Sequence, residues 1–162
     1  MKRIYNLSFL ISFFILVASC EDFLDRDPEG WMTQEEYFRM PNAGYKSVVK
    51  CYQTLKSAYG YEWARAEIGN MSTDESEKGG SDAGDRPFVM DLAYGRATSA
   101  NKTLNDFWSD LFTGIANCND ALENLPIRVL TDANGFPLSD QIRNRYIAEV
   151  RVLRAFYYFE LV

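Results

Sequence analysis

Two long stretches of this sequence place apolar residues on one face of a helix, which constrains the fold more than any other feature. In residues 104–125 the apolar side chains recur at intervals of three and four, and Pro126 ends the pattern. Residues 142–161 repeat this spacing, and residues 45–59 carry a third stripe that Gly60 is expected to stop. No alternation typical of a strand extends over a comparable length, so we predict an all-α fold.

Shorter signals indicate how the predicted helices are connected. The capping box from Thr33 to Glu36 predicts a short helix that stops before Pro41. Residues 70–87 are rich in glycine, serine and acids without an apolar repeat, which predicts a long loop. Ser139 is the expected N-cap of the last helix. Within the stripe of residues 104–125, we expect the Trp108 side chain to lie in the core.

The amino terminus has the features of a secretory signal. Lys2 and Arg3 precede an apolar run over residues 7–18. Twelve residues span only about 18 Å as a helix, whereas a bilayer core is roughly 30 Å thick. Small residues and Cys20 follow this run, and together they resemble a bacterial lipobox. The resemblance implies that residues 1–19 are cleaved off, that Cys20 carries a thioether-linked lipid and that the new amino terminus is acylated. The alternative is an ordinary signal peptide in which this cysteine is incidental.

The composition excludes several classes of chemistry. The 162 residues contain no histidine, so no Ser-His-Asp or Cys-His nucleophile and no histidine-containing zinc site can form. A net charge of -6 argues against nucleic acid as a partner. Chemistry based on carboxylates alone remains possible. Cys51 and Cys118 are compatible with a disulfide or with two buried thiols, and the sequence leaves both open.

Three segments of the chain resemble one family. They are Cys20 with Phe23-Leu24-Asp25 and Pro28, then Trp108-x-x-Leu111-Phe112-x-x-Ile115-x-x-Cys118-Asn119-x-x-Leu122, and finally Ala148-Glu149-Val150-Arg151-Val152-Leu153-Arg154-Ala155-Phe156-Tyr157-Tyr158-Phe159-Glu160-Leu161-Val162. Together they resemble the N-terminal part of the SusD/RagB family of nutrient-binding outer-membrane lipoproteins. The third segment is the most specific of the three.

The resemblance implies tetratricopeptide-like helical pairs that carry long loops. It implies a palmitate-type lipid anchor in the outer membrane of a Bacteroidota cell, with Glu21 and Asp22 after the lipidated cysteine acting as a surface-export signal. The implied partner is a TonB-dependent transporter of the SusC type. The implied ligand is an oligosaccharide or a peptide, captured for import without catalysis, cofactor or metal.

Aromatic and polar residues around the long loop are the candidate ligand contacts. Aromatic rings stack on the apolar faces of sugars, and planar polar groups bind sugar hydroxyls. The candidates are Trp63, Asp74, Glu75, Arg86, Tyr94 and Asn101. The plainer interpretation is a solvated acidic loop over packed aromatic residues. The loop acids also suggest a calcium site, but they lack the spacing of an EF-hand.

Two other functions remain open at this stage. One is a helical scaffold lipoprotein without small-ligand binding, and the other is a glycosidase based on two carboxylates. The expected organisation is a signal peptide over residues 1–19 and a SusD-like N-terminal helical region over residues 20–162. We expect this region to be incomplete at its C-terminus, because SusD-like proteins continue well beyond the third segment.

Overall fold

The computed structural model describes Gly30, residues 32–82 and residues 84–162. Residues 35–162 form one compact unit. The signal peptide and the lipidation site Cys20 lie outside the described residues. The α-helices of the described part are α3 (Gln34–Arg39), α4 (Ala43–Gln53), α5 (Trp63–Met71), α6 (Pro87–Ala93), α7 (Lys102–Asn124) and α8 (Asp140–Glu160). The described part contains an isolated bridge between Thr131 and Pro137 but no β-strand, so the all-α prediction is confirmed.

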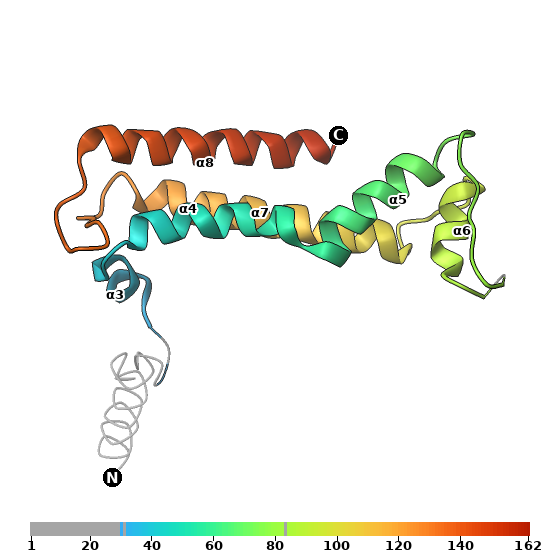
Figure 1. Ribbon diagram of the computed structural model, residues 1–162, viewed down its shortest axis with the longest axis horizontal. Coiled ribbons are helices and arrows are strands. Elements are labelled where there is room, and N and C mark those ends of the chain that lie inside the picture. Colours follow the sequence, from blue (N-terminus) through green and yellow to red (C-terminus); the bar gives the residue numbers. More distant parts are fainter. Residues whose placement is uncertain (1–29, 31, 83) are drawn as a thin grey trace, which may run out of the picture. The chain divides into compact units, whose positions relative to one another are not determined.

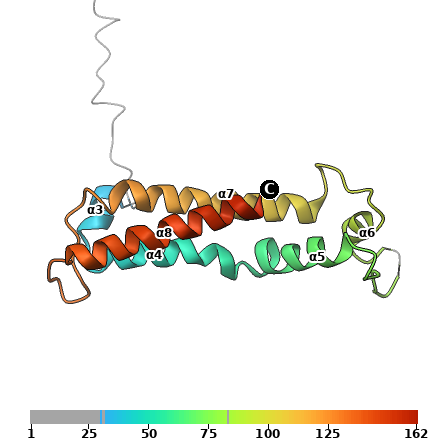
Figure 2. The same ribbon diagram turned by 90° about the horizontal axis from the view of Figure 1, so that it is seen from above.

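The three helices α4, α7 and α8 pack side by side and build the core. Figures 1 and 2 show α7 running antiparallel to both α4 and α8. The predicted N-cap of α8 is confirmed, because the Ser139 hydroxyl accepts a hydrogen bond from the Ile142 N–H at 3.4 Å. The predicted short helix is α3, which ends before Pro41.

Tyr157 lies at the centre of this three-helix core. Its side chain is fully buried, and its hydroxyl donates a hydrogen bond of 2.5 Å to the Cys51 carbonyl oxygen in α4. Its ring lies against Gly114 of α7, where a Cβ atom would approach the ring carbon Cε2 to 2.7 Å. One side chain from α8 therefore contacts both other helices of the core.

The two cysteines are free thiols in this core. Cys51 and Cys118 are both fully buried. Hydrogen bonding with Cys118 and burial raise the pKa of the Cys51 thiol, so Cys51 stays protonated at neutral pH. Of the two possibilities that the sequence left open, the structure shows buried thiols rather than a disulfide.

The helix predicted over residues 45–59 ends earlier than expected, and the prediction of Gly60 as its stop is wrong. α4 ends at Gln53 and is followed by a 3₁₀ turn (Thr54–Lys56) and a π-helix (Ala58–Glu62) that leads directly into α5. Gly60 lies inside the π-helix, where a Cβ atom would overlap the carboxylate of Asp110 from α7. The glycine therefore permits close packing rather than ending a helix.

The expectation that Trp108 lies in the core is also wrong. Its side chain is 57% exposed, whereas the preceding Phe107 stacks on the buried Tyr61 with ring centroids 5.8 Å apart. Successive helical residues are rotated by about 100°, so only one of two adjacent aromatic residues can point at the same neighbour. Here Phe107 takes the inner position.

The predicted long loop lies between α5 and α6, without regular structure in its described residues. The short helices α5 and α6 on either side of it were not predicted. Across the described residues, every helix is too short or too polar to span a lipid bilayer.

Candidate functional site

Two exposed aromatic rings lie one helical turn apart where the π-helix passes into α5. Tyr59 and Trp63 are four residues apart, and their side chains are 81% and 53% exposed. Their ring centroids are 6.5 Å apart with an angle of 27° between the ring planes. Two stacked rings that face solvent form an apolar platform that the fold does not use for packing.

Arg86 lies against this platform from the far end of the long loop. Its guanidinium carbon is 5.5 Å from the Trp63 ring centroid and 5.3 Å from that of Phe88. The Arg86 guanidinium also forms an ion pair with Glu67 of α5. Glu67 in turn accepts a hydrogen bond of 2.9 Å from the Thr103 hydroxyl of α7. These contacts hold the charged group in place beside the ring.

The backbone at Arg86 explains how the loop delivers this side chain. Its φ of 51° and ψ of 62° lie in the left-handed region, which a non-glycine residue adopts at an energetic cost. Pro87, the first residue of α6, disfavours the right-handed helical conformation for the residue before it. The chain therefore turns sharply at Arg86 and enters α6 directly.

We call this group of five side chains the Trp63 cluster, which consists of Tyr59, Trp63, Glu67, Arg86 and Phe88. It offers stacked aromatic faces next to a guanidinium group whose side chain is 40% exposed. A guanidinium has five N–H donors, and the ion pair with Glu67 leaves others to bind a ligand hydroxyl. The cluster thus combines an aromatic surface, on which the apolar C–H face of a ligand can stack, with the N–H donors of Arg86.

The structure brings two of the predicted ligand contacts, Trp63 and Arg86, into this cluster. Asp74 and Glu75 are exposed in the loop, and no hydrogen bond or ion pair joins either to the cluster in the described part of the chain. Tyr94 is 67% exposed at the end of α6, where the Arg96 guanidinium lies 5.0 Å from its ring centroid. The Tyr94 ring thus lies against Arg96 and not against Arg86 of the cluster.

Asn101 is buried and serves as the N-cap of α7. Its side-chain oxygen accepts hydrogen bonds from the N–H groups of Thr103 at 3.0 Å and Leu104 at 3.3 Å. Its amide nitrogen donates to the Phe88 carbonyl oxygen at 2.7 Å. Asn101 therefore joins the start of α7 to α6 and holds Phe88 of the cluster in position.

We expect Asn101→Ala to lower the free energy of unfolding by about 1–2 kcal/mol, because the cap of α7 is lost. Asn101→Asp keeps the oxygen acceptor and removes the donor to Phe88, so its cost should be smaller, about 0.5–1.5 kcal/mol. Urea unfolding followed by circular dichroism measures both values. Equal costs for the two variants would show that the cap contributes nothing.

Three members of the cluster were not among the predicted contacts: Tyr59, Glu67 and Phe88. The four-residue spacing of Tyr59 and Trp63 is visible in the sequence. That spacing alone did not indicate solvent exposure, because the same spacing marks core residues in the long stripes. Phe88 lies only two residues after Arg86, whereas Glu67 is brought to Arg86 by the fold across the long loop, a contact that no local pattern encodes.

In the described part of the loop, the acidic side chains are not grouped as the ligands of a cation would be. In residues 32–82 and 84–162, no group of three or more acidic or cysteine side chains is placed to hold a metal ion. The loop instead contains local hydrogen bonds, such as the 2.7 Å bond from the Gly84 N–H to the Asp82 carboxylate.

Comparison with known proteins shows similarity along nearly the whole chain. The chain is 26% identical to the SusD-like proteins P38 (over 168 residues) and P25 (over 170 residues) of Formosa agariphila. Each alignment covers 99% of this chain but only 29% and 30% of the respective relative, so the chain spans less than a third of their length. None of the established protein-family models matches it. These two relatives support the resemblance that the three sequence segments indicated, and the similarity to SusD-like proteins extends over almost the entire chain.

Proposed function

We propose that this chain belongs to a lipid-anchored outer-membrane protein that captures an oligosaccharide, with the Trp63 cluster as a contact surface for the sugar. The observation that carries the proposal is the exposed Tyr59–Trp63 pair with Arg86 held against it. The similarity to SusD-like proteins supports a binding role rather than catalysis.

The geometry of the cluster fits a sugar ring better than it fits an apolar ligand. A pyranose ring presents C–H groups on one face and hydroxyl groups around its edge. Stacking on Trp63 covers the apolar face, and the remaining N–H groups of Arg86 lie beside it to bind hydroxyl oxygens. Because Arg86 is already oriented by Glu67, little side-chain entropy is lost on binding.

The cellular part of the proposal rests on the sequence and its relatives. Cys20 carries the lipid, and the anchored protein delivers its ligand to a SusC-like TonB-dependent transporter. Asp74, Glu75 and Tyr94 act as secondary contacts on the loop and α6. No catalysis, metal or cofactor is part of this function.

Trp63→Ala is expected to weaken oligosaccharide binding at least tenfold, or by about 1.4 kcal/mol, because the stacking face is lost. The measurement is isothermal titration calorimetry of the full chain with the best ligand from a panel of neutral oligosaccharides. Tyr94→Ala is expected to have a smaller effect, because that ring is paired with Arg96 instead of Arg86.

Phe136→Ala provides a matched control for this experiment. Phe136 is 67% exposed on the loop between α7 and α8 and forms no aromatic pair in the described part of the chain. Its removal should leave sugar affinity unchanged. A chain that binds no member of the panel would favour a scaffold role, and release of reducing sugar would favour a glycosidase. Unchanged affinity in Trp63→Ala would remove the cluster from the proposal.

A further inference from the structure

Glu67 sets the net charge of the Trp63 cluster. It follows Trp63 by four residues in α5, and its side chain is only 11% exposed. One carboxylate oxygen, Oε1, forms the ion pair with the Arg86 guanidinium, and the other accepts the hydrogen bond of 2.9 Å from the Thr103 hydroxyl. The cluster therefore contains one cation and one anion, and its net charge is zero.

The Glu67 carboxylate cannot release Arg86 without a large cost in free energy. A carboxylate that is removed from water is destabilised unless an opposite charge and hydrogen bonds compensate it. Thr103 is buried and supplies a single hydroxyl, so Arg86 is the positive charge that compensates Glu67 among the described residues. A ligand that took Arg86 for its own carboxylate would leave Glu67 without a counter-charge.

The chain around the cluster carries no surplus of positive charge. Residues 59–96 contain eight acidic and four basic side chains. The other two arginines in this range are also paired with carboxylates, at 2.8 Å for Arg65 and at 3.5 Å for Arg96. Two acids directly adjoin members of the cluster in sequence and form no ion pair in the described part of the chain, namely Glu62 and Asp85. The charges of this region therefore disfavour anions.

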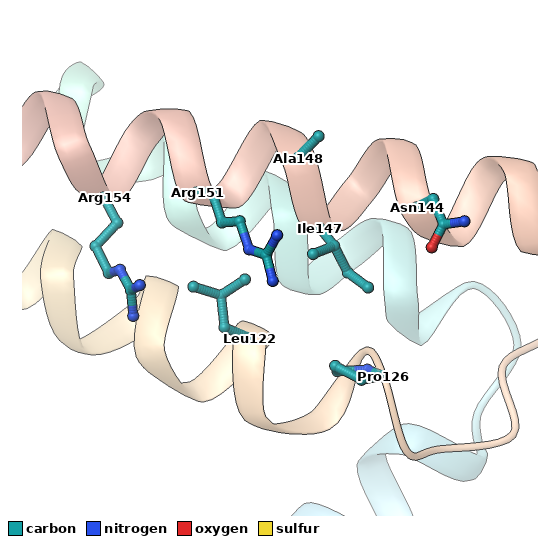
Figure 3. Close-up of a pocket in the computed structure, with 7 residues that line it drawn as sticks. All are labelled: Leu122, Pro126, Asn144, Ile147, Ala148, Arg151 and Arg154. Carbon is teal, nitrogen blue, oxygen red and sulfur yellow. The ribbon is translucent and has the colours of Figure 1, made fainter.

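Pairing with a carboxylate is not general for the arginines of this chain. Arg151 and Arg154 project from α8 toward α7 in a groove between the two helices (Figure 3). Among the described residues neither forms an ion pair, and Arg154 instead donates a hydrogen bond of 2.9 Å to the neutral side-chain oxygen of Asn119. The excess of acids thus does not neutralise every arginine, and the placement of Glu67 is what neutralises Arg86.

We propose that Glu67 makes the Trp63 cluster selective for neutral sugars and against anionic sugars such as uronic acids. This selectivity rests on the proposed function, because it concerns a ligand at the same surface. Hydroxyl oxygens of a neutral sugar can accept hydrogen bonds from the remaining N–H groups of Arg86 while its ion pair with Glu67 stays intact. A ligand carboxylate at these groups would lie close to the Glu67 carboxylate, without an unshared positive charge to offset the loss of its hydration.

Matched pairs of tetrasaccharides test this selectivity. Each pair consists of a neutral sugar and its uronic acid, which differ only in a hydroxymethyl or a carboxylate group on each ring. The three pairs are built from glucose, mannose and galactose and from the corresponding glucuronic, mannuronic and galacturonic acids. Isothermal titration calorimetry of the full chain at low ionic strength is expected to show tighter binding of the neutral member.

Glu67→Gln removes the negative charge and keeps an oxygen that can accept the Thr103 hydroxyl. It is expected to shift the ratio of the two affinities about fourfold toward the uronic acid, which is the Coulomb factor for removing a like charge about 5 Å away in water. Arg86→Gln is expected to weaken both sugars and to shift the ratio in the opposite direction. A merely structural role for Glu67 would lower both affinities by the same factor.

Glu149→Gln is the matched control for Glu67→Gln. It removes one carboxylate from the chain and frees an arginine, Arg145, but both residues belong to α8 and lie outside the cluster. The variant therefore has the same net charge as Glu67→Gln. We expect it to leave the ratio of the two affinities unchanged.

Trp63 fluorescence measures the charge of the cluster without any sugar. Trp31→Phe and Trp108→Phe together leave Trp63 as the single tryptophan, and circular dichroism checks that each variant is folded. Iodide and caesium quench this fluorescence and carry opposite charges. The ratio of iodide to caesium quenching is expected to rise about fourfold in Glu67→Gln and to fall in Arg86→Gln.

Two results would overturn the selectivity. One is equal or tighter binding of the uronic acids by the unmodified chain, and the other is a quenching ratio that Glu67→Gln leaves unchanged. Either can occur while neutral sugars still bind, which leaves the proposed function intact. A chain that binds neither member of any pair contradicts the proposed function itself, and the quenching ratio then still decides whether Glu67 sets the charge.

Discussion

Replacing Tyr157 with alanine is expected to lower the free energy of unfolding by about 3–5 kcal/mol. The ring is fully buried at the contact between α4, α7 and α8, so its removal leaves a cavity in the centre of the core. The loss also breaks the hydrogen bond to the Cys51 carbonyl oxygen. Urea unfolding of the full chain, followed by circular dichroism, measures this change in the free energy of unfolding.

Tyr157→Phe separates the ring from the hydroxyl. Burial raises the pKa of Tyr157, so its hydroxyl stays protonated and remains a donor throughout the neutral range. Phenylalanine keeps the ring and loses the bond of 2.5 Å, for which we expect a cost of about 0.5–1.5 kcal/mol. A cost for Tyr157→Ala no larger than that of Tyr157→Phe would contradict a central position for the ring.

Gly114→Ala is expected to destabilise the fold by about 1–3 kcal/mol, although alanine is the better helix former. A Cβ atom at this position would lie 2.7 Å from Cε2 of Tyr157 and 3.0 Å from Cδ2 and Cζ. The ring cannot move away, because its hydroxyl is bound to α4 and its surroundings are close-packed. The same denaturation measurement gives this value.

Gly69→Ala is the matched control, since Gly69 also lies within a helix, α5. A Cβ atom there has no neighbour within 4 Å, so alanine should stabilise the chain by about 0.5–1 kcal/mol through its helix propensity. In a Tyr157→Ala background, Gly114→Ala should lose its penalty, because the clashing ring is absent. Stabilisation by Gly114→Ala in the unmodified chain would show that α7 and α8 lie farther apart than the structure has them.

Sequence periodicity predicted the long helices well because their energetics are largely local. An apolar side chain every three or four residues produces one face that must be buried, and this condition identified α7 and α8 without any tertiary information. Ser139 was recognised as a cap because its bond closes within three residues. The predicted loop between α5 and α6 follows in the same way from residues that cannot bury apolar surface.

The candidate site was predicted only in part. Trp63 and Arg86 were expected as ligand contacts, and the structure places them against each other. Asn101 was given the same role, yet all of its polar atoms serve the start of α7 and its connection to α6. An asparagine near a helix start fits both roles, and only the position of Phe88 in space distinguishes them.

The sequence by itself therefore determined the helical class and the long helices, and it indicated the similarity of the chain to SusD-like proteins. The tertiary structure decided which side of each stripe is covered and which residues meet across the loop. The packing of Phe107 rather than Trp108 against the core, and the contact of Gly114 with Tyr157, depend on how α7 is rotated against its neighbours. That rotation is set by packing of side chains far apart in sequence, whereas periodicity records only the spacing along one helix.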